Sequence, residues 1–352
     1  MKVYAFVPRQ PSMTAHSSMH PLMPCVNAKP ILYDCAWKSL QNFSWTLGHL
    51  LQRFGTWYSG SELNATTPVW DELKFLRAID APGPSVAHFL LGETVAMKWP
   101  RLFHAKGAAI VGTFHATQWR QHRALKNYHD FGFYDWITVV SKSQIPFMVE
   151  RGFPEERIRL ILHGVDADYF RPAERRGEDG SGPLKALLVG KTERDHEFMA
   201  RVMKNIPAGT IELVVATPDE QKVHYRDTPG VRLLDRVSDE ELKNLYQSRD
   251  LLVMPMIDCT ANNAILESMA CGTPVLANRV GGIPEYVPES SSYILDGKKA
   301  DEWADLLVHL SRNRQELQSR RAAAREWAEN FAWPKKAVEY LEVYEAAVSR
   351  FG

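Results

Sequence analysis

The chain has 352 residues, 45% of them hydrophobic, and its 42 Lys and Arg balance its 42 Asp and Glu. This composition predicts a globular protein of two domains and argues against a nucleic-acid partner. No apolar run approaches the roughly 18 residues that a membrane span requires, and the first residues show no signal-peptide pattern. Cys25, Cys35, Cys259 and Cys271 lack metal-binding spacing, which predicts reduced thiols in a cytoplasmic protein.

Charge is unevenly distributed along the chain. Up to Asp168 there are 17 basic and 13 acidic residues, a net charge of +4, so 25 basic and 29 acidic residues, net −4, remain for the rest. Nine of the twelve histidines also lie in this first half. The first half of the chain is therefore mildly basic.

Short apolar runs alternate with stretches of helical period almost throughout the chain. A helix is expected where Leu40, Phe43, Leu47, Leu50, Leu51 and Phe54 recur, and another from Leu242 to Tyr246 behind a Ser238 cap with Glu241 three residues on. Buried strands are expected at KVYAFV (2–7), SVAHFLL (85–91), AAIVGTFH (108–115), WITVVS (136–141), IRLILHG (158–164), KALLVG (185–190), IELVVAT (211–217), VRLLD (231–235), DLLVMPM (250–256) and TPVLANR (273–279). Continuous apolar strands separated by helices indicate an α/β protein with parallel sheets.

The run RPAERRGEDGSGP (171–183) is charged, Gly-rich and without apolar periodicity. Such a run inside a compact domain is unusual, so it predicts an interdomain linker. The expected organisation is a Rossmann-like domain over 1–172, a linker over 173–183, a second Rossmann-like domain over 184–332 and a C-terminal helix over 333–352 that packs back on the first domain. Ligands are expected in a cleft between the carboxyl ends of the two sets of strands.

The stretch DCTANNAILESMACGTPVLANRVGGIPEYV (258–287) carries the clearest chemistry. It predicts a loop entering a helix N-terminus at the carboxyl edge of a sheet, where free backbone N–H groups favour an anion such as a diphosphate. Glu267 lies about one turn into an otherwise apolar helix, where a carboxylate needs hydrogen-bond donors. A ribose diol would supply two donors, whereas a solvated or salt-bridged glutamate is the alternative.

This arrangement resembles the donor site of retaining GT-B glycosyltransferases, specifically glycosyltransferase family 4. The family pattern is a Glu, seven residues and a second Glu, followed by a Met-Ala-Cys-Gly-x-Pro-Val run and a Gly-Gly-x-Pro-Glu. Here Glu267, MACGTPV (269–275) and GGIPE (281–285) match it, and the segments at 134–172, 189–198 and 331–344 are similar too. The resemblance covers nearly the whole chain and implies a GT-B fold, with an acceptor-side first domain facing a nucleotide-sugar-binding second domain across a cleft.

The resemblance also implies roles for individual residues. Glu267 would accept hydrogen bonds from the nucleotide ribose, and Lys191 and Arg194 would stabilise the leaving diphosphate. His115 would orient the transferred sugar from the acceptor side, and His88 and residues 92–94 are weaker candidates nearby. Further donor contacts are implied for Asp258, Thr260, Ala261, Asn262, Asn263 and Gly190. Without the resemblance, the cationic pair would be read as a solvated turn and His115 as a structural histidine.

The sequence departs from the family pattern at three places. Cys259 stands where the first Glu of the pair is expected, and only the neighbouring Asp258 could replace that carboxylate. In the family a Gly-rich turn follows the first strand, but here residues 8 to 30 contain no glycine. His163 replaces the Asn of the usual NGVD. These changes indicate a variant site rather than an inactive one.

The predicted function is the retaining transfer of a hexosyl group from a nucleotide-diphosphate sugar to an acceptor hydroxyl, in glycan, glycolipid or glycoconjugate biosynthesis. Neither a cofactor nor a metal is expected, because the D-x-D of Asp166 and Asp168 lies at the domain junction rather than after a nucleotide-binding strand. A dehydrogenase is disfavoured, since no GxGxxG follows the first strand. The alternative is a catalytically inactive GT-B protein that binds a nucleotide sugar or regulates a partner.

The acceptor is the part that the sequence defines least. Trp119, Arg120, Arg123 and Lys126 recur within two helical turns just after His115. This basic stretch could bind a sugar, a lipid-linked or another small-molecule acceptor, or lie against an anionic membrane surface. An ordinary solvated helix is the alternative.

Overall fold

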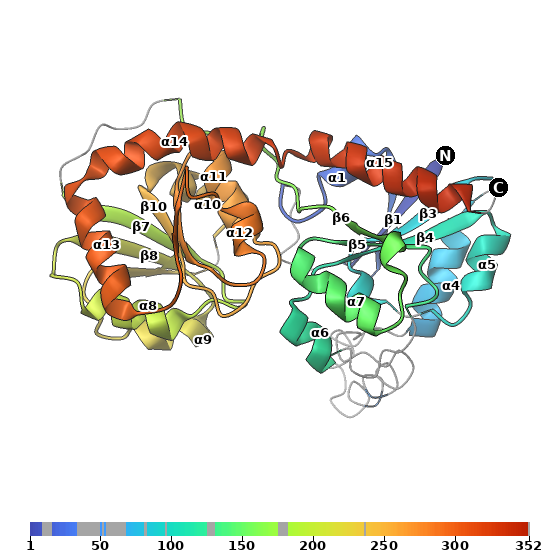
Figure 1. Ribbon diagram of the computed structural model, residues 1–352, viewed down its shortest axis with the longest axis horizontal. Coiled ribbons are helices and arrows are strands. Elements are labelled where there is room, and N and C mark those ends of the chain that lie inside the picture. The colour runs from blue at the N-terminus through green and yellow to red at the C-terminus, as the bar shows by residue number, and fades with distance from the viewer. Residues whose placement is uncertain are drawn as a thin grey trace. The chain divides into compact units, whose positions relative to one another are not determined.

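The computed structural model describes residues 1–8, 16–33, 50, 53, 68–80, 83–95, 97–124, 131–174, 182–235 and 237–350. Contacts divide the chain into two compact units, each built on its own sheet (Figure 1). The first unit comprises Met1–His163 and Trp333–Gly352, and the second comprises Gly164–Ala332. Among the described residues, no helix has both the length and the apolar character that a membrane span requires.

The first unit is a parallel sheet with the strand order β2-β1-β3-β4-β5-β6. Its strands are β1 (Lys2–Pro8), β2 (Ala28–Tyr33), β3 (Ser85–Phe89), β4 (Ala108–Phe114), β5 (Trp136–Val139) and β6 (Ile158–Leu160). Alternate residues of β1 enter opposite cores: Tyr4 and Phe6 pack on one face, and Val3, Ala5 and Val7 on the other. Both faces are therefore buried, as expected for parallel strands.

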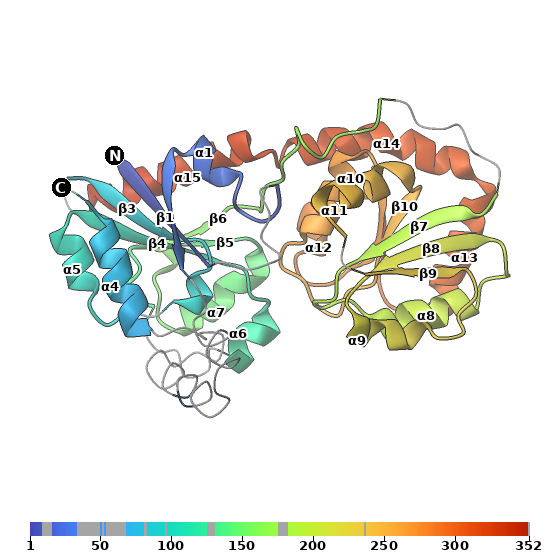
Figure 2. The same ribbon diagram turned by 180° about the vertical axis from the view of Figure 1, so that it is seen from behind.

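Helices cover both faces of this sheet (Figures 1 and 2). One face is covered by α4 (Pro68–Ala78), α5 (Pro100–Ala105) and α7 (Ile145–Glu150), and the other by α1 (Leu22–Cys25) and α15 (Trp333–Ser349). The short α6 (Gln118–Ala124) follows β4, and the 3₁₀ turn η1 (Gly92–Thr94) follows β3. Helix α15 comes from the far end of the chain and buries Trp333, Tyr340 and Tyr344 against the sheet.

The second unit repeats the plan with the strand order β12-β11-β10-β7-β8-β9, again parallel. Its strands are β7 (Leu184–Val189), β8 (Ile211–Ala216), β9 (Val231–Leu234), β10 (Leu251–Met254), β11 (Val275–Asn278) and β12 (Tyr293–Leu295). Its helices are α8 (His196–Lys204), α9 (Asp219–Lys222), α10 (Asp239–Ser248), α11 (Asn263–Ala270), α12 (Ile283–Tyr286), α13 (Ala300–Arg312) and α14 (Arg314–Glu329). Helices α8 and α13 pack on one core of the sheet, and α11 packs between the sheet and α14.

The α/β prediction is confirmed, and all ten predicted strands are present. The predicted capping box is also present, because Ser238 Oγ accepts the Glu241 N–H and the Glu241 carboxylate accepts the Ser238 N–H. Two strands were missed, β2 and β12, and both lie at an edge of their sheet. β2 contains Pro30, which a strand tolerates only at an edge. The helix expected over 40–54 lies outside the described residues, except for positions 50 and 53.

The boundary between the units falls at His163, before the end of the predicted first domain at residue 172. Val165 forms a bridge with Ala332, and one Arg325 nitrogen donates at 2.9 Å to the carbonyl oxygens of both Ala167 and Phe170. The backbone bridge and the hydrogen bonds from the Arg325 side chain tie the segment 164–172 to the second unit. Local periodicity does not reveal these contacts. Residues 175–181 of the predicted linker lie outside the described residues.

His88 joins three elements of the first unit. The sequence analysis had weakly suggested that it lines a cleft, but it does not. Its Nδ1 lies 2.7 Å from the Tyr344 hydroxyl of α15, and its Nε2 lies 2.7 Å from Thr113 Oγ1 of β4. The side chain is 1% exposed. Burial lowers the pKa of His88 to about 3, with a smaller effect from His115. The imidazole is therefore neutral and structural.

We predict that His88→Gln reduces the acid sensitivity of the protein. The pKa of His88 in the folded protein lies below its ordinary value, so between about pH 4 and 6 the unfolded chain holds one proton that the folded chain lacks, and stability falls with falling pH. Removing the imidazole should lower the slope of unfolding free energy against pH by about 1.4 kcal/mol per pH unit. Urea unfolding at several pH values measures it, with the exposed His309→Gln as control. An unchanged slope in His88→Gln would contradict the prediction.

Candidate active site

The loop after β7 is held in a left-handed turn. Gly190 has φ +88°, and a Cβ at this position would lie 3.2 Å from the Arg194 guanidinium. His196 Nε2 donates to the Gly190 carbonyl at 2.9 Å, and His196 Nδ1 accepts from the Tyr225 hydroxyl at 2.9 Å. Burial lowers the pKa of His196, in keeping with a neutral ring. The backbone of Gly190 is thus fixed from behind by a buried histidine.

Arg194 is the cation that this loop directs into the site. Its guanidinium donates to the carbonyls of Val189 at 3.1 Å and Thr192 at 2.6 Å, and to Asn262 Oδ1 at 3.2 Å. Burial lowers the pKa of Arg194, while the Glu267 carboxylate acts in the opposite direction. An arginine remains charged under such conditions. The chain therefore places a fixed positive charge beside the loop that precedes α11.

Lys191, the other predicted cation, pairs its side chain with an acidic residue of the same unit. Its Nζ pairs with Glu220 Oε1 at 2.8 Å, and the two side chains are 52% and 54% exposed. Exposed ion pairs are weak because water and salt screen them. Lys191 is therefore available for an anionic ligand only if it leaves Glu220.

The loop from Asp258 leads into the N-terminus of α11. Asn262 is its N-cap residue but makes no side-chain cap bond. The Asn262 amide instead accepts from Arg194 and donates toward Met256 Sδ at 3.8 Å. Thr260 and Asn262 are buried, whereas Ala261 and Asn263, the first residue of α11, are partly buried. The first turn of α11 thus lacks a side-chain cap and lies close to Arg194, a combination that suits an anion.

Cys259 carries no charge at the position where a carboxylate was expected. It is 4% exposed, and burial raises the pKa of its thiol to about 12, against the opposing effect of Arg194. The carboxylate of the neighbouring Asp258 accepts the N–H of Cys259 through Oδ1 at 2.7 Å. Position 259 therefore lacks the negative charge that the family pattern has there.

The Gly-Gly turn of GGIPE packs against the same loop. The Gly282 N–H donates to the Cys259 carbonyl at 2.8 Å. Gly281 has φ +51°, and a Cβ there would lie 2.0 Å from the Cys259 oxygen and 2.9 Å from Asp258 Oδ1. Glycine is thus required at residue 281 because the backbone of the loop passes directly over it.

Glu267 lies on α11, 4% exposed, and its Oε2 accepts a hydrogen bond from the Tyr246 hydroxyl at 3.0 Å. Tyr246 belongs to α10 and is fully buried. The sequence analysis assigned no site role to Tyr246 or to His196. Tyr246 was recognised only by its helical spacing, and His196 lay unremarked in the motif at 189–198. A polar side chain at a core-facing position was the available signal for both residues.

His115 lies in the first unit, in the loop after β4. Its backbone N–H donates to the Glu93 carboxylate at 3.1 Å and 3.3 Å, and its Nε2 lies 2.9 Å from the Leu90 carbonyl. A carbonyl only accepts, so Nε2 carries the proton and Nδ1 is the acceptor nitrogen. Burial, and then His163, lower the pKa of His115 to about 3. His115 is therefore neutral and suited to accepting a hydrogen bond rather than to acid catalysis.

Glu93 shapes the surroundings of His115. Burial raises the pKa of Glu93 to about 7, while hydrogen bonds from backbone N–H groups, including that of His115, and the charge of Arg120 act in the opposite direction. Among the predicted acceptor-side residues, Arg120 is partly buried and Trp119 is 56% exposed on α6. The backbone of Arg123 belongs to α6, but its side chain lies outside the described residues.

Other features contribute nothing to this site. Among the described residues, no group of His, Cys, Asp and Glu could hold a metal ion. Asp166 of the D-x-D instead accepts the Tyr169 N–H at 3.1 Å in a turn. The second unit also has a cavity of about 390 Å³, lined by Pro172, Ala173, Cys271, Gly272, Arg321, Ala322, Arg325, Glu326 and Glu329. None of the predicted site residues lines it.

The sequence of the second unit is similar to that of a known protein family. Residues 184–313 match the family described as Glycosyl transferases group 1. The D-inositol 3-phosphate glycosyltransferases of Mycobacterium bovis and Mycobacterium tuberculosis are 29% identical over 223 residues, which are 57% of this chain and 46% of those proteins. The chain thus matches about half the length of these curated relatives.

Solved structures match the chain over almost its whole length. A Rickettsia africae glycosyltransferase has a TM-score of 0.68 at 15% identity, with 99% of this chain and 98% of that chain covered. Anabaena HepE, solved with UDP and glucose, has a TM-score of 0.70 at 14% identity, with 98% and 100% covered. These likenesses establish the GT-B fold.

We predict that Gly281→Ala destabilises the second unit. The added methyl group would lie 2.0 Å from the Cys259 oxygen, so the Asp258–Asn263 loop would have to shift. We expect a loss of about 1–3 kcal/mol in the free energy of unfolding. Urea unfolding measures this loss, and Gly297→Ala is the matched control because a Cβ there meets nothing within 4 Å. Equal stability of the two variants would show that the loop tolerates the shift.

Proposed function

We propose that this protein is a GT-B glycosyltransferase that moves a hexosyl group from a nucleotide-diphosphate sugar to an acceptor hydroxyl. The observation that carries the proposal is the buried Glu267 carboxylate, one helical turn from an N-terminus that lacks a side-chain cap and lies close to Arg194. A ribose diol supplies donors to a carboxylate, and a diphosphate suits a helix N-terminus with a nearby cation. The UDP in HepE supports the same ligand class.

Charge stabilisation is the chemistry that these residues offer. As the glycosidic bond breaks, negative charge grows on the leaving diphosphate, and groups fixed in advance around it lower the barrier. Arg194 is held by two carbonyls and Asn262, so little reorganisation is needed. Lys191 would add a second charge after leaving Glu220. Gly190 and the loop 260–263 would supply backbone N–H groups.

The proposal extends to the acceptor side and to the stereochemistry. The resemblance gives His115 the role of orienting the transferred sugar, and its Nε2–H donates to the Leu90 carbonyl. Arg120 lies close enough to Glu93 to affect its pKa, and Glu93 holds the His115 backbone. We therefore place an acceptor with anionic or lipid-linked character near Trp119, Arg120 and Arg123. Retention of the anomeric configuration rests on the resemblance to retaining family 4 enzymes.

A second candidate is a nucleotide-sugar-binding protein without turnover, favoured by the uncharged thiol of Cys259. The two functions differ in one assay. Incubating the purified protein with UDP-, GDP- and ADP-sugars, with and without candidate acceptors, should release nucleotide if the protein is an enzyme. Binding of a sugar nucleotide without any release, in the presence of acceptors, would favour the second candidate.

We predict that Glu267→Ala weakens nucleotide binding. Losing a charged acceptor should cost about 2 kcal/mol, which is roughly a 30-fold rise in the dissociation constant. Isothermal titration calorimetry with UDP, GDP and ADP measures the change. Glu302→Ala, at an exposed position on α13, is the control that should bind as the wild type does. Equal affinity in wild type and Glu267→Ala would remove Glu267 from the donor site.

We also predict metal-independent transfer with retention. The fixed charge of Arg194 and the N-terminus of α11 would neutralise the leaving group without a cation, so activity should persist in EDTA. Nuclear magnetic resonance of the product should show the anomeric configuration of the donor. Loss of activity in EDTA that manganese restores would contradict metal independence, and an inverted product would contradict retention.

A further inference from the structure

We propose that Tyr246 is a positioning residue of the donor site, whose hydroxyl fixes the orientation of the Glu267 carboxylate for the nucleotide ribose. The inference rests on the proposed function, because it gives Glu267 the ribose as its ligand. It adds a residue from a different helix, α10, that would not touch the ligand itself. Its effect should therefore depend on the ribose hydroxyls.

The contact between the two side chains has only one possible direction. Tyr246 OH lies 3.0 Å from Glu267 Oε2, and an ionised carboxylate can only accept. Burial, and then the Glu267 carboxylate, raise the pKa of Tyr246 well above its ordinary value, so the phenol keeps its proton. Tyr246 is 0% exposed and Glu267 is 4% exposed, so water competes little for this bond.

The bond also determines what remains for a ligand. A carboxylate has about four lone-pair sites, and Tyr246 occupies one of those on Oε2. In the proposed function, two neighbouring ribose hydroxyls would donate to the same carboxylate. Rotation of the carboxylate would break the Tyr246 bond, so the Tyr246 hydroxyl holds the carboxylate plane in one orientation before the nucleotide binds. Such preorganisation lowers the entropy cost of binding.

Tyr246 is itself held firmly at the C-terminal end of α10. Thr273 Oγ1 donates to the Tyr246 carbonyl at 2.7 Å, and Ser268 Oγ of α11 donates to the Thr273 carbonyl at 3.1 Å. The Tyr246 ring packs against Phe170 with centroids 6.1 Å apart. Helix α10, which carries Tyr246, is thus bonded through Thr273 to helix α11, which carries Glu267.

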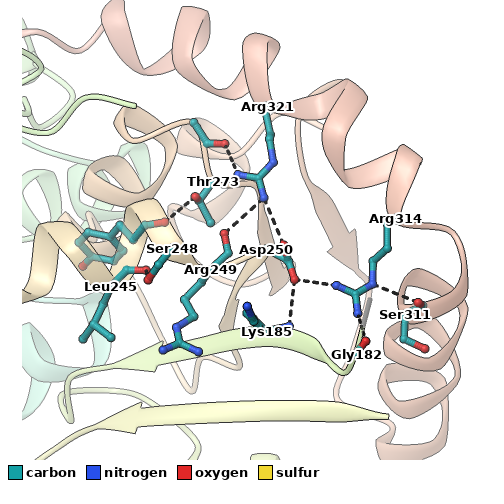
Figure 3. Close-up of polar contacts among 12 residues, drawn as sticks. Gly182, Lys185, Leu245, Ser248, Arg249, Asp250, Thr273, Ser311, Arg314 and Arg321 are labelled. Atoms are coloured by element: carbon teal, nitrogen blue, oxygen red, sulfur yellow. Dashed lines mark hydrogen bonds and ion pairs between the residues drawn. The ribbon is translucent and has the colours of Figure 1, made fainter. Parts of the chain in front are cut away.

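The residues after Tyr246 are anchored as well (Figure 3). Asp250 Oδ2 accepts the Lys185 N–H at 3.0 Å and Arg314 Nη1 at 2.7 Å. Arg321 donates to the Arg249 carbonyl at 3.3 Å and lies 3.5 Å from Asp250 Oδ1. Figure 3 shows these arginines reaching from α14 to the junction of α10 and β10. The junction that follows Tyr246 is therefore bonded to both β7 and α14.

The experiment compares Tyr246→Phe with the wild type on two ligands, UDP and 2′,3′-dideoxy-UDP, by isothermal titration calorimetry. If Tyr246 acts through Glu267 on the ribose, the substitution should weaken UDP binding by about tenfold. It should change dideoxy-UDP binding by less than about twofold, because that ligand lacks the hydroxyls that Glu267 binds. This is a double-mutant cycle between a side chain and two ligand atoms.

Two controls keep the outcomes separate. Tyr344→Phe also removes a buried hydroxyl, the one bonded to His88 in the first unit, and should leave UDP affinity unchanged. Equal weakening of both ligands by Tyr246→Phe would mean that the tyrosine is merely structural, and unchanged binding of both would mean that it has no role. If the wild type binds none of UDP, GDP and ADP, the proposed function itself fails. If it prefers GDP or ADP, the cycle is run with that nucleotide and its dideoxy form.

Discussion

The site depends on a carboxyl group, that of Glu267, placed inside a protein core. Glu267 lies on a helix whose residues from Ala264 to Ala270 are all buried, and an isolated charge there would be strongly destabilising. Tyr246 of α10 donates a hydrogen bond to this carboxyl group, and the charge of Arg194, in the loop after β7, also interacts with it. The position of Tyr246 depends on the anchored end of α10, and the position of Arg194 depends on the left-handed turn at Gly190. Because β7 and β10 are neighbouring parallel strands, these parts come together at the carboxyl ends of the strands.

Cys259 changes the charge balance of this arrangement. With a neutral thiol in place of a second carboxylate, Arg194 has Glu267 beside it and the amide oxygen of Asn262 as a neutral partner. A less neutralised arginine attracts a phosphate more strongly. In the proposed donor site, the substitution would remove a polar contact from the sugar end and leave the diphosphate end more positive. A weakly bound sugar with a firmly bound diphosphate is the expected character of such a site.

Much of the fold could be predicted because each buried strand is a continuous apolar run, and the loop–helix segment from Asp258 could be predicted because its turn chemistry is local. Other features depend on residues that are distant in the sequence. The assignment of 164–172 to the second unit rests on Arg325, and the burial of His88 depends on Tyr344. Periodicity could place Tyr246 on the inward face of α10, but it could not show that a carboxylate would lie opposite. The pairing of Lys191 with Glu220 was hidden for the same reason.

Helix α15 gives the two units different relations to chain synthesis. Residues 164–332 are contiguous, so the second unit is complete once they have left the ribosome. The first unit lacks α15 until the whole second unit has been made, and α15 supplies Trp333, Tyr340 and Tyr344 to one of its two cores. During that interval Val3, Ala5 and Val7 of β1 lack their final cover. The first unit therefore begins synthesis first and finishes folding last, which departs from the usual order in which N-terminal domains fold before those that follow.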